Sequence, residues 1–259
     1  MEVNASMSYT LDNIIAERKD KTVYRDTNKT IKLFCENYSK ADILNEALNQ
    51  ARVEEGTDLY VPKLHEVTKI ENNWAIVTEY IDGTPLSVLM ERNPEKEDEY
   101  LELFVRIQMT ILSKKVPLLS SIKDKFKRKI NNATNINDSI RYELLHRLEG
   151  MKNHTKLCHG DFVPNNIIIK ANGEYYIIDW AHATQGNASA DAARTFLQFS
   201  MQGKTELAEK YLEEFAKQST IDKQNVQRWV PIVAATQLTK GKPEEEEFLR
   251  HWIDVIDYE

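Results

Sequence analysis

The residues with the clearest capacity for chemistry lie in one short segment, residues 159–166, which reads His-Gly-Asp-Phe-Val-Pro-Asn-Asn. Asp161 and Asn166 are five positions apart, and a second carboxylate, Asp179, follows thirteen positions after Asn166. Phosphoryl transfer needs such groups, because a carboxylate must orient the attacking hydroxyl and oxygen ligands must hold magnesium on the polyphosphate. The segment therefore indicates phosphoryl transfer, provided that the three side chains meet.

The stretch between Asn166 and Asp179 predicts how the three side chains come together. Two apolar runs, residues 166–169 and 175–178, flank the sequence Lys-Ala-Asn-Gly-Glu. Asn-Gly between apolar runs is the strongest short signal for a β-hairpin. A hairpin returns the chain to the edge where it began, so we expect the oxygen-bearing side chains of Asp161, Asn166 and Asp179 to converge there.

The first third of the chain has the pattern of a small sheet. Residues 14–16, 22–24 and 30–34 are β-rich runs between polar turns, which predicts an antiparallel meander. Two further strands are expected at residues 63–69 and 74–79.

One helix is expected between these strands, at residues 40–54. Ser39 fits the N-cap position of this helix. Apolar residues recur at helical spacing and form a stripe: Ile43, Leu44, Ala47, Leu48 and Ala51. Glu46 falls outside that stripe.

The rest of the chain is mostly helical in pattern. The sequence Asp-Gly-Thr-Pro at residues 82–85 interrupts the strands as a linker does. From there to about residue 156, and again after Asp191, the apolar periodicity is that of helices. This order of elements predicts an α+β protein with two lobes. We place an amino-terminal lobe at residues 1–80, a connection at 81–86 and a carboxyl-terminal lobe at 87–259.

The composition favours a globular protein of the cytoplasm. The chain has 34 basic and 41 acidic residues, a net charge of −7, which argues against a dedicated surface for nucleic acid or anionic membranes. Two cysteines, Cys35 and Cys158, are too few for a disulfide framework. Residues 1–6 lack the features of a signal peptide, and no apolar run approaches the roughly 20 residues of a membrane span. Secretion and membrane insertion are therefore not expected.

Residues 159–166 resemble the catalytic loop of the aminoglycoside phosphotransferase and choline kinase-like family, in which His-Gly-Asp is usual. Asp161 and Asn166 have the spacing of the kinase catalytic loop, with Gly160 in place of arginine. The resemblance covers residues 14–199 and weakens towards the carboxyl end. It implies a bilobal protein-kinase-like fold, with a small antiparallel sheet and one helix in an amino-terminal nucleotide-binding lobe. The larger, mostly helical lobe would carry catalysis and acceptor binding.

The resemblance also implies roles for individual residues. Asp161 would be the catalytic base or the carboxylate that positions the hydroxyl, and Asn166 and Asp179 would hold magnesium. His159 and Asp191 would give the catalytic loop structural support.

Four further residues are implied in nucleotide binding. Lys32 lies centrally in the third expected strand, where kinases carry the lysine that holds the α- and β-phosphates. We choose Glu46 as its partner because Glu46 lies in the middle of the next helix, outside the apolar stripe. Residues 78–86 resemble the family's lobe connection, where backbone groups of Glu79 and Ile81 would meet an adenine edge.

The implied function is that of an ATP- and magnesium-dependent kinase that phosphorylates a hydroxyl of a small molecule, with GTP open as an alternative donor. Aminoglycosides, choline or ethanolamine, homoserine, a thioribose and other sugars stay open as acceptors. A second hypothesis is a nucleotide-binding regulatory module with little or no turnover. It is motivated by residues 17–21, between the first two strands, which contain no glycine to bring backbone N–H groups close to phosphates. A protein kinase is disfavoured, because no Ala-Pro-Glu segment follows Asp179.

Three other features have simple explanations. Cys158, next to His159, is expected to be buried packing rather than a nucleophile, since neighbouring side chains in a strand face opposite ways. Residues 243–247, Pro-Glu-Glu-Glu-Glu, fit a helix amino terminus better than an anionic pocket for a cationic substrate. His182 and Gln185 follow Asp179, near where an acceptor is expected.

Overall fold

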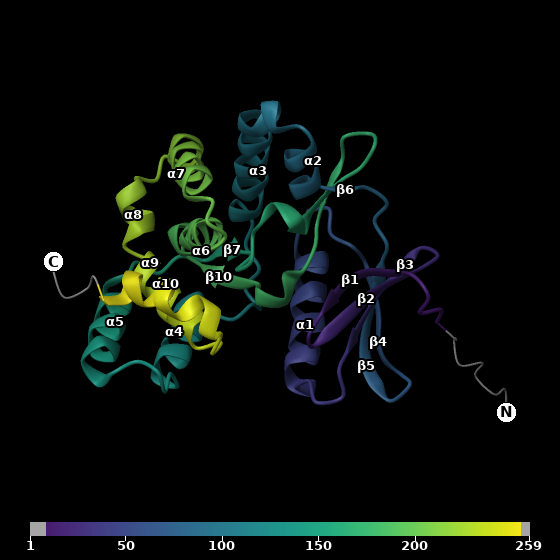
Figure 1. The fold of residues 1–259 in the computed structure, drawn as a ribbon, viewed down its shortest axis with the longest axis horizontal. Helices are drawn as coiled ribbons and strands as arrows, with labels where there is room; N and C mark the ends of the chain where they lie inside the picture. Colours follow the sequence, from purple (N-terminus) through teal and green to yellow (C-terminus); the bar gives the residue numbers. More distant parts are fainter. Residues whose placement is uncertain (1–8, 255–259) are drawn as a thin grey trace. The chain divides into compact units, whose positions relative to one another are not determined.

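The computed structural model describes residues 9–254, so residues 1–6, on which the expectation about a signal peptide rests, lie outside the described range. The chain divides into two compact units. The first runs up to Pro85 and takes in Ile167–Ala181, whereas the second consists of Leu86–Asn166 and the chain from His182 onward. Figure 1 shows the helices and strands of both units and labels most of them.

The first unit contains a five-stranded antiparallel sheet and one long helix, as the sequence predicts. The strands lie in the order β1-β2-β3-β5-β4. Their bounds are Ile14–Arg18 for β1, Lys21–Asp26 for β2, Lys29–Phe34 for β3, Leu64–Ile70 for β4 and Asn73–Glu79 for β5. The three strands of the expected meander pair in sequence, and β3 then pairs with β5, which leaves β4 at the edge of the sheet.

Side chains of β3 alternate between the two faces of this sheet, as the period of a strand requires. Ile31 and Leu33 belong to the apolar cluster on one face. Phe34 packs on the other face against Ile43 of helix α1, Lys40–Gly56. Lys32 shares its face with Phe34, so its side chain is directed towards α1.

Helix α1 begins as predicted, because the Ser39 hydroxyl accepts a hydrogen bond from the backbone N–H of Asp42. The expected apolar stripe is only partly correct, since Leu44 and Leu48 are 43% and 47% exposed. Polar groups occupy part of the buried face instead. Glu46 is buried there, and the amide of Gln50 donates to the backbone oxygen of Pro62 at 2.6 Å.

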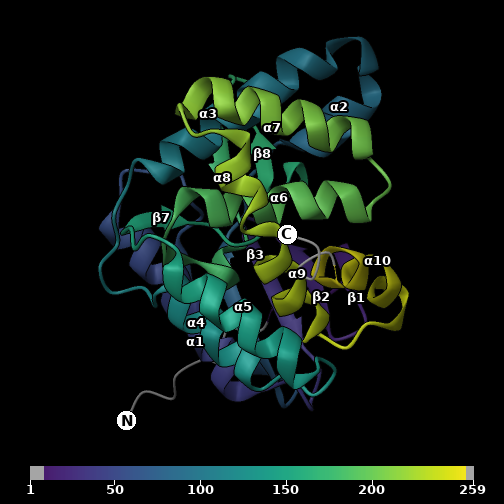
Figure 2. The same ribbon diagram turned by 90° about the vertical axis from the view of Figure 1, so that its left-hand side faces the viewer.

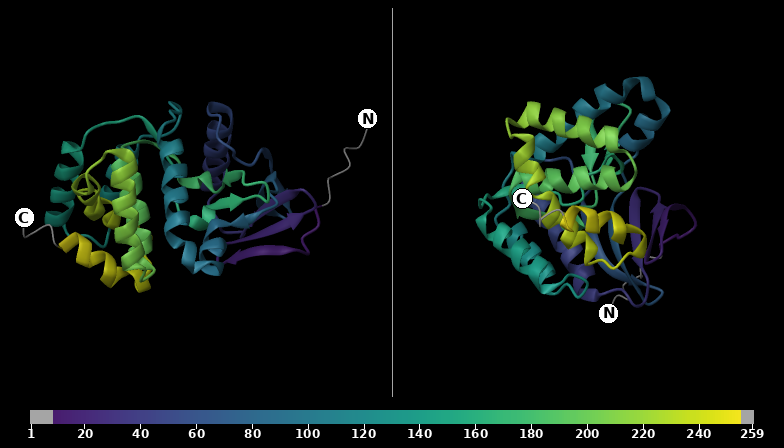
Figure 3. Two further views of the ribbon diagram at one scale, coloured as in Figure 1. Left: turned by 90° about the horizontal axis from the view of Figure 1, so that it is seen from above. Right: turned by 60° about the vertical axis from the view of Figure 1, so that its left-hand side comes forward.

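The predicted hairpin is formed by β8, Ile167–Ile169, and β9, Tyr175–Ile177. A short strand, β6, Thr84–Pro85, pairs with β8 to make a three-stranded sheet, and Figure 3 shows the strands of the hairpin in green. The backbone N–H of Ile177 also donates to the oxygen of Tyr60. These contacts place the hairpin in the first unit, although its residues fall within the carboxyl-terminal lobe that we expect from the sequence.

The second unit is mostly helical, and Figure 2 shows α3, α6 and α7 within it. Helices α2 and α3 span Leu86–Arg92 and Glu97–Leu112, α4 and α5 span Ile122–Asn131 and Asp138–Gly150, and α6 and α7 span Ala188–Met201 and Thr205–Ser219. Helices α8, α9 and α10 span Lys223–Gln227, Val230–Leu238 and Pro243–Asp254. Two short strands, β7, Lys156–Cys158, and β10, Thr184–Gly186, pair antiparallel. None of the helices within residues 9–254 has the length and apolar character needed to cross a membrane.

Candidate active site

Lys32 and two carboxylates form a polar cluster in the first unit. The Lys32 ammonium donates hydrogen bonds to the carboxylate of Glu46 and, at 3.1 Å, to Oδ1 of Asp179. Burial disfavours the charged ammonium, but the carboxylates of Asp179 and Glu46 outweigh that effect and raise the pKa of Lys32 above its ordinary value. Lys32 is therefore a fixed cation at neutral pH, which is the state that can bind phosphate oxygens.

The segment after β9 holds Asp179 in an unusual backbone conformation. Asp179 has a φ of 63°, in the left-handed region that residues other than glycine seldom adopt. Two hydrogen bonds fix the chain around it: Nε1 of Trp180 donates to the oxygen of Ile177, and the amide of Asn49 donates to the oxygen of Ala181. Strain of this kind is concentrated at functional sites, where the surroundings must enforce it.

The loop at residues 159–166, in the second unit, requires glycine at position 160. Gly160 has a φ of 77°, and a Cβ atom at this position would lie 2.5 Å from the backbone oxygen of His182. The arginine that kinases carry here would collide with that oxygen. Next to it, the buried His159 accepts a hydrogen bond from the backbone N–H of Asp161 through Nδ1. His159 thus contacts the loop directly.

Asn166 closes the same loop at its other end. It ends a short 3₁₀ helix, Pro164–Asn166, and its side-chain nitrogen donates to the backbone oxygen of Asp161 at 2.8 Å. This bond fixes the amide plane. Because the amide nitrogen makes the bond, the amide oxygen is the atom of Asn166 suited to a cation.

Asp191, in the first turn of α6, is hydrogen-bonded to the backbone of this loop. Its Oδ1 accepts from the backbone N–H of Gly160 at 2.7 Å, and its Oδ2 accepts from the amide of Gln108 at 3.2 Å. The hydroxyl of Tyr211 donates in turn to Gln108 at 2.6 Å. Asp191 is thus part of a buried hydrogen-bond chain, in which each member orients the next.

Two residues that our sequence analysis missed contact Asp161 from the same helix. The guanidinium of Arg194 lies 3.5 Å from Oδ1 of Asp161, and the amide of Gln198 donates to the same oxygen. With Asp191 and Thr195, they occupy positions i, i+3, i+4 and i+7 of an otherwise largely apolar helix. That polar stripe is a sequence signal from which all four could have been found.

The expected adenine-binding connection has a definite hydrogen-bond pattern. The backbone N–H of Glu79 donates to the oxygen of Lys63, and that of Tyr80 donates to the oxygen of Asn28. Within residues 9–254, we find no backbone hydrogen bond of Ile81. The assignment of Glu79 and Ile81 to adenine stays a prediction, and the backbone N–H of Ile81 is the one of the two that makes none of these bonds.

The sequence over residues 20–225 matches the phosphotransferase enzyme family. The chain belongs to that family. The expected resemblance and the bilobal α+β fold are therefore confirmed. No relative is found among the curated proteins.

Solved structures of other phosphotransferases share the fold. Aminoglycoside phosphotransferase APH(4)-Ia, in a ternary complex with ADP and hygromycin B, is 14% identical, with a TM-score of 0.69 over 94% of this chain and 92% of that one. Choline kinase LicA from Streptococcus pneumoniae is 16% identical, with a TM-score of 0.60 over 96% and 94%. ADP-bound aminoglycoside phosphotransferase APH(2'')-Ib is 15% identical, with a TM-score of 0.62 over 96% and 93%.

The predicted site residues of this phosphotransferase fall into two groups. Asp179 lies with Lys32 and Glu46 in the first unit, and Asp161 lies with Asn166 in the second. The convergence of all three oxygen-bearing side chains spans both units and stays a prediction.

The donor atoms of the phosphotransferase suit magnesium. Asn166 offers an amide oxygen and Asp179 a carboxylate, and both are hard oxygen ligands. No group of three or more His, Cys, Asp or Glu side chains in the described part of the chain could hold a metal. Magnesium in kinases needs no such cage, because one or two side chains hold it together with substrate phosphates.

Other residues that we considered as functional candidates from the sequence have structural roles. Cys158 is buried, and burial raises the pKa of its thiol well above the ordinary value, which is the opposite of what a nucleophile needs. The amide of Gln185 donates to the backbone oxygens of Pro117 and Leu119. The acidic run begins α10, where Glu245 pairs with Lys242 at 2.8 Å, so the interpretation as a helix amino terminus is correct.

Proposed function

We propose that this phosphotransferase is a small-molecule kinase that transfers the γ-phosphoryl group of ATP to a hydroxyl in a magnesium-dependent reaction. The observation that carries the proposal is the Lys32 ammonium between the carboxylates of Glu46 and Asp179. A lysine held in this way offers a fixed positive charge to the α- and β-phosphates.

Asp161 would act on the acceptor. Its backbone is held by Asn166 and His159, and its carboxylate by Arg194 and Gln198, so the carboxylate has a defined direction. A carboxylate in this state can orient the hydroxyl for in-line attack and accept its proton. Because the transition state of phosphoryl transfer is loose, orientation and charge neutralisation supply most of the catalysis.

Asn166 and Asp179 would hold the magnesium ion. When bound, magnesium neutralises charge on the phosphate oxygens. The strained backbone at Asp179 fits this role, since a backbone held in one conformation gives the Asp179 carboxylate one direction. Glu79 and Ile81 would meet the adenine edge through their backbone groups.

The relatives support a nucleotide and a small hydroxylated acceptor as partners. APH(4)-Ia is a phosphotransferase complexed with ADP and an aminoglycoside, and LicA is a choline kinase. We propose the same reaction class here, and a cytoplasmic location, which fits the two free cysteines.

The test has two measurements on the full-length protein. Calorimetric titration measures the binding of ATP and GTP with magnesium, and a coupled assay measures ADP release across a panel of hydroxylated acceptors, with product identified by mass spectrometry. We expect acceptor-dependent ADP release that stops when EDTA removes magnesium. Tight nucleotide binding with no phosphorylated product from any acceptor would instead support a regulatory module. That second hypothesis is motivated by the glycine-free turn between β1 and β2.

A further inference from the structure

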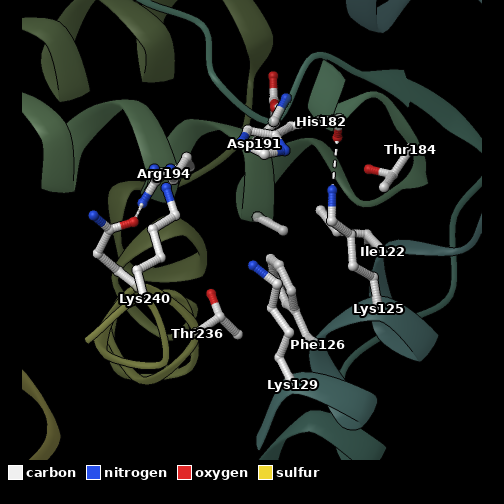
Figure 4. A pocket seen from close by; sticks show the side chains of 13 residues that line it. Ile122, Lys125, Phe126, Lys129, His182, Thr184, Asp191, Arg194, Thr236 and Lys240 are labelled. Carbon is white, nitrogen blue, oxygen red and sulfur yellow. Dashed lines mark hydrogen bonds between the residues drawn. The ribbon is translucent and has the colours of Figure 1, made fainter. Parts of the chain in front are cut away.

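A cavity in the second unit has four cationic side chains among the thirteen residues that line it. Its walls come from α4, β10, α6 and the end of α9, together with Gly160 and His182, and all of these lie in the second unit. Figure 4 shows the side chains around it. Four of the lining side chains are basic and one is acidic: Lys125, Lys129, Arg194 and Lys240 against Asp191.

Three carboxylates act on these four cations. Asp191 lines the cavity, Asp161 contacts Arg194 at 3.5 Å, and Glu245 attracts both Arg194 and Lys240. Among these groups four cations face three carboxylates, so the cavity has a small excess of positive charge.

The pKa values of two lysines reflect this crowding. Burial, followed by repulsion from Lys129, Arg194, Lys240 and Arg128, lowers the pKa of Lys125 to about 7. Burial and the charge of Arg194 lower the pKa of Lys240 to about 8. Positive charge is unfavourable here in the protein alone, and a bound anion would make it favourable.

A second, independent feature also indicates a ligand. Thr184 lines the cavity and is only 2% exposed, yet its hydroxyl has no hydrogen-bond partner among the described residues. Buried polar groups are nearly always paired, so an unpaired hydroxyl on a cavity wall is suited to a ligand atom. A hydroxyl can donate to an oxygen of an anion.

The size of the cavity limits what its enclosed part can hold. The cavity volume is about 40 Å³. At roughly 10–15 Å³ for each water, this space corresponds to about three waters, which is the scale of a single carboxylate or phosphate group. A sugar ring would have to remain outside it.

We propose that this cavity binds an oxyanion group, a carboxylate or a phosphate, that belongs to the acceptor. The acceptor of the kinase would then be a hydroxylated anion rather than a cation such as choline or an aminoglycoside. Arg194 lines the cavity and also contacts Asp161. A group anchored at Arg194, Lys240 and Thr184 therefore brings the rest of the acceptor to the catalytic carboxylate. This inference rests on the proposed function.

The experiment measures oxyanion binding separately from turnover. Thermal-shift and calorimetric titrations of the full-length protein use inorganic phosphate, a sugar phosphate, a hydroxycarboxylate, choline and kanamycin as probes, because specific binding stabilises the folded state. We expect the sugar phosphate and the hydroxycarboxylate to bind and the two cations not to. The coupled assay should show phosphorylation of at least one hydroxylated anion.

Four variants locate the binding. Lys240→Met and Thr184→Val should each weaken oxyanion binding about tenfold, since each removes one donor to a charged group. Thr184→Val removes an unpaired hydroxyl, so the variant should fold at least as stably as the wild type. Lys127→Met is the matched control, because Lys127 is exposed on α4 and does not line the cavity. Lys32→Met separates this site from the nucleotide site and should leave oxyanion binding unchanged.

The outcomes distinguish the inference from the proposed function. Acceptor-dependent turnover with choline or kanamycin, and no oxyanion binding, would overturn the inference and leave the kinase function intact. Binding of free phosphate alone, with no affinity for hydroxylated anions, would overturn the acceptor assignment. Oxyanion binding that Lys240→Met weakens as expected, with no phosphorylated product from any acceptor, would support the cavity and contradict the kinase function.

Discussion

The guanidinium of Arg194 lies 3.5 Å from the carboxylate of Asp161, and this contact links the loop at residues 159–166 to α6. Arg194 is itself held by Gln237, whose side-chain oxygen accepts from Arg194 at 2.6 Å. Gln198 contacts the same oxygen of Asp161 from the next turn of the helix. The direction of the Asp161 carboxylate is therefore set by a rigid helix rather than by its own loop, as positioned catalytic groups require.

Asp161→Asn should lower kcat about 10²–10⁴-fold, because the amide cannot accept the hydroxyl proton. Nucleotide affinity should stay within about twofold, since the predicted nucleotide ligands Lys32 and Ile81 are unchanged. The amide keeps the size of the carboxylate, and the backbone bond from Asn166 remains. Steady-state kinetics and calorimetric titration with Mg-ATP check both values. Wild-type kcat in this variant would exclude Asp161 as the base.

Lys32→Met should lower kcat about 10²–10³-fold, the usual loss when one fixed charge on the reacting group is removed. Glu46→Gln should have a smaller effect in the same direction, because Lys32 keeps its contact with Asp179. Lys69→Met, at an exposed position of the same sheet, is the matched control and should keep wild-type kinetics. If Lys32→Met and Lys69→Met had equal activity, Lys32 would have no role in phosphate binding.

Much of this arrangement could be predicted from the sequence, because local patterns determine it. β-Rich runs between polar turns indicated the sheet, Ser39 indicated the start of α1, and the Asn-Gly pair indicated the hairpin of β8 and β9. Lys32 was assigned from its place in a strand, and the structure pairs it with Glu46 as expected.

The parts that could not be predicted depend on contacts between distant segments. Strands β7 and β10 have only three residues each, too few for a periodicity, and they exist because they pair with each other. Leu44 and Leu48 are exposed because the buried face of α1 accommodates Glu46 and Gln50, which no apolar periodicity can reveal. The cationic cavity combines α4, α6 and the end of α9, which lie far apart in sequence.

Gly160→Ala should destabilise the protein more than Gly203→Ala does. Both glycines have a left-handed φ, 77° and 74°, so alanine costs about 1–2 kcal/mol at either position. Only at Gly160 would the Cβ meet another atom, the oxygen of His182 at 2.5 Å, whereas nothing lies within 4 Å at Gly203. The collision should add about 1–3 kcal/mol, as overpacking does.

Urea denaturation of both glycine variants measures the two free energies of unfolding, and steady-state kinetics measures turnover. Gly203→Ala should keep wild-type kcat, whereas Gly160→Ala should lose activity because the backbone of Asp161 must shift. Equal loss of stability in the two variants would show that the loop has room for a side chain.

Lys125 should make the stability of the protein depend on pH. Its pKa is lowered to about 7 by burial and by the neighbouring cations Lys129, Arg194, Lys240 and Arg128, against 10.5 for the ordinary lysine. Between these two values the unfolded chain binds more protons than the folded protein. The free energy of unfolding therefore rises with pH from about 7 towards 10, by at most about 1.4 kcal/mol per pH unit from this group.

Lys125→Met isolates that contribution. The variant loses the hydrogen bond from Lys125 to the oxygen of His182 but no longer carries a lysine that must be charged below pH 7. Relative to wild type, it should be most stable at pH 6 and should lose this advantage by pH 9, as measured by urea denaturation. Lys127→Met, at an exposed position of the same helix, should show no such change in the difference from wild type. A difference between wild type and Lys125→Met that is constant from pH 6 to 9 would mean that Lys125 keeps an ordinary pKa, because its folded and unfolded states would then bind protons equally over this range.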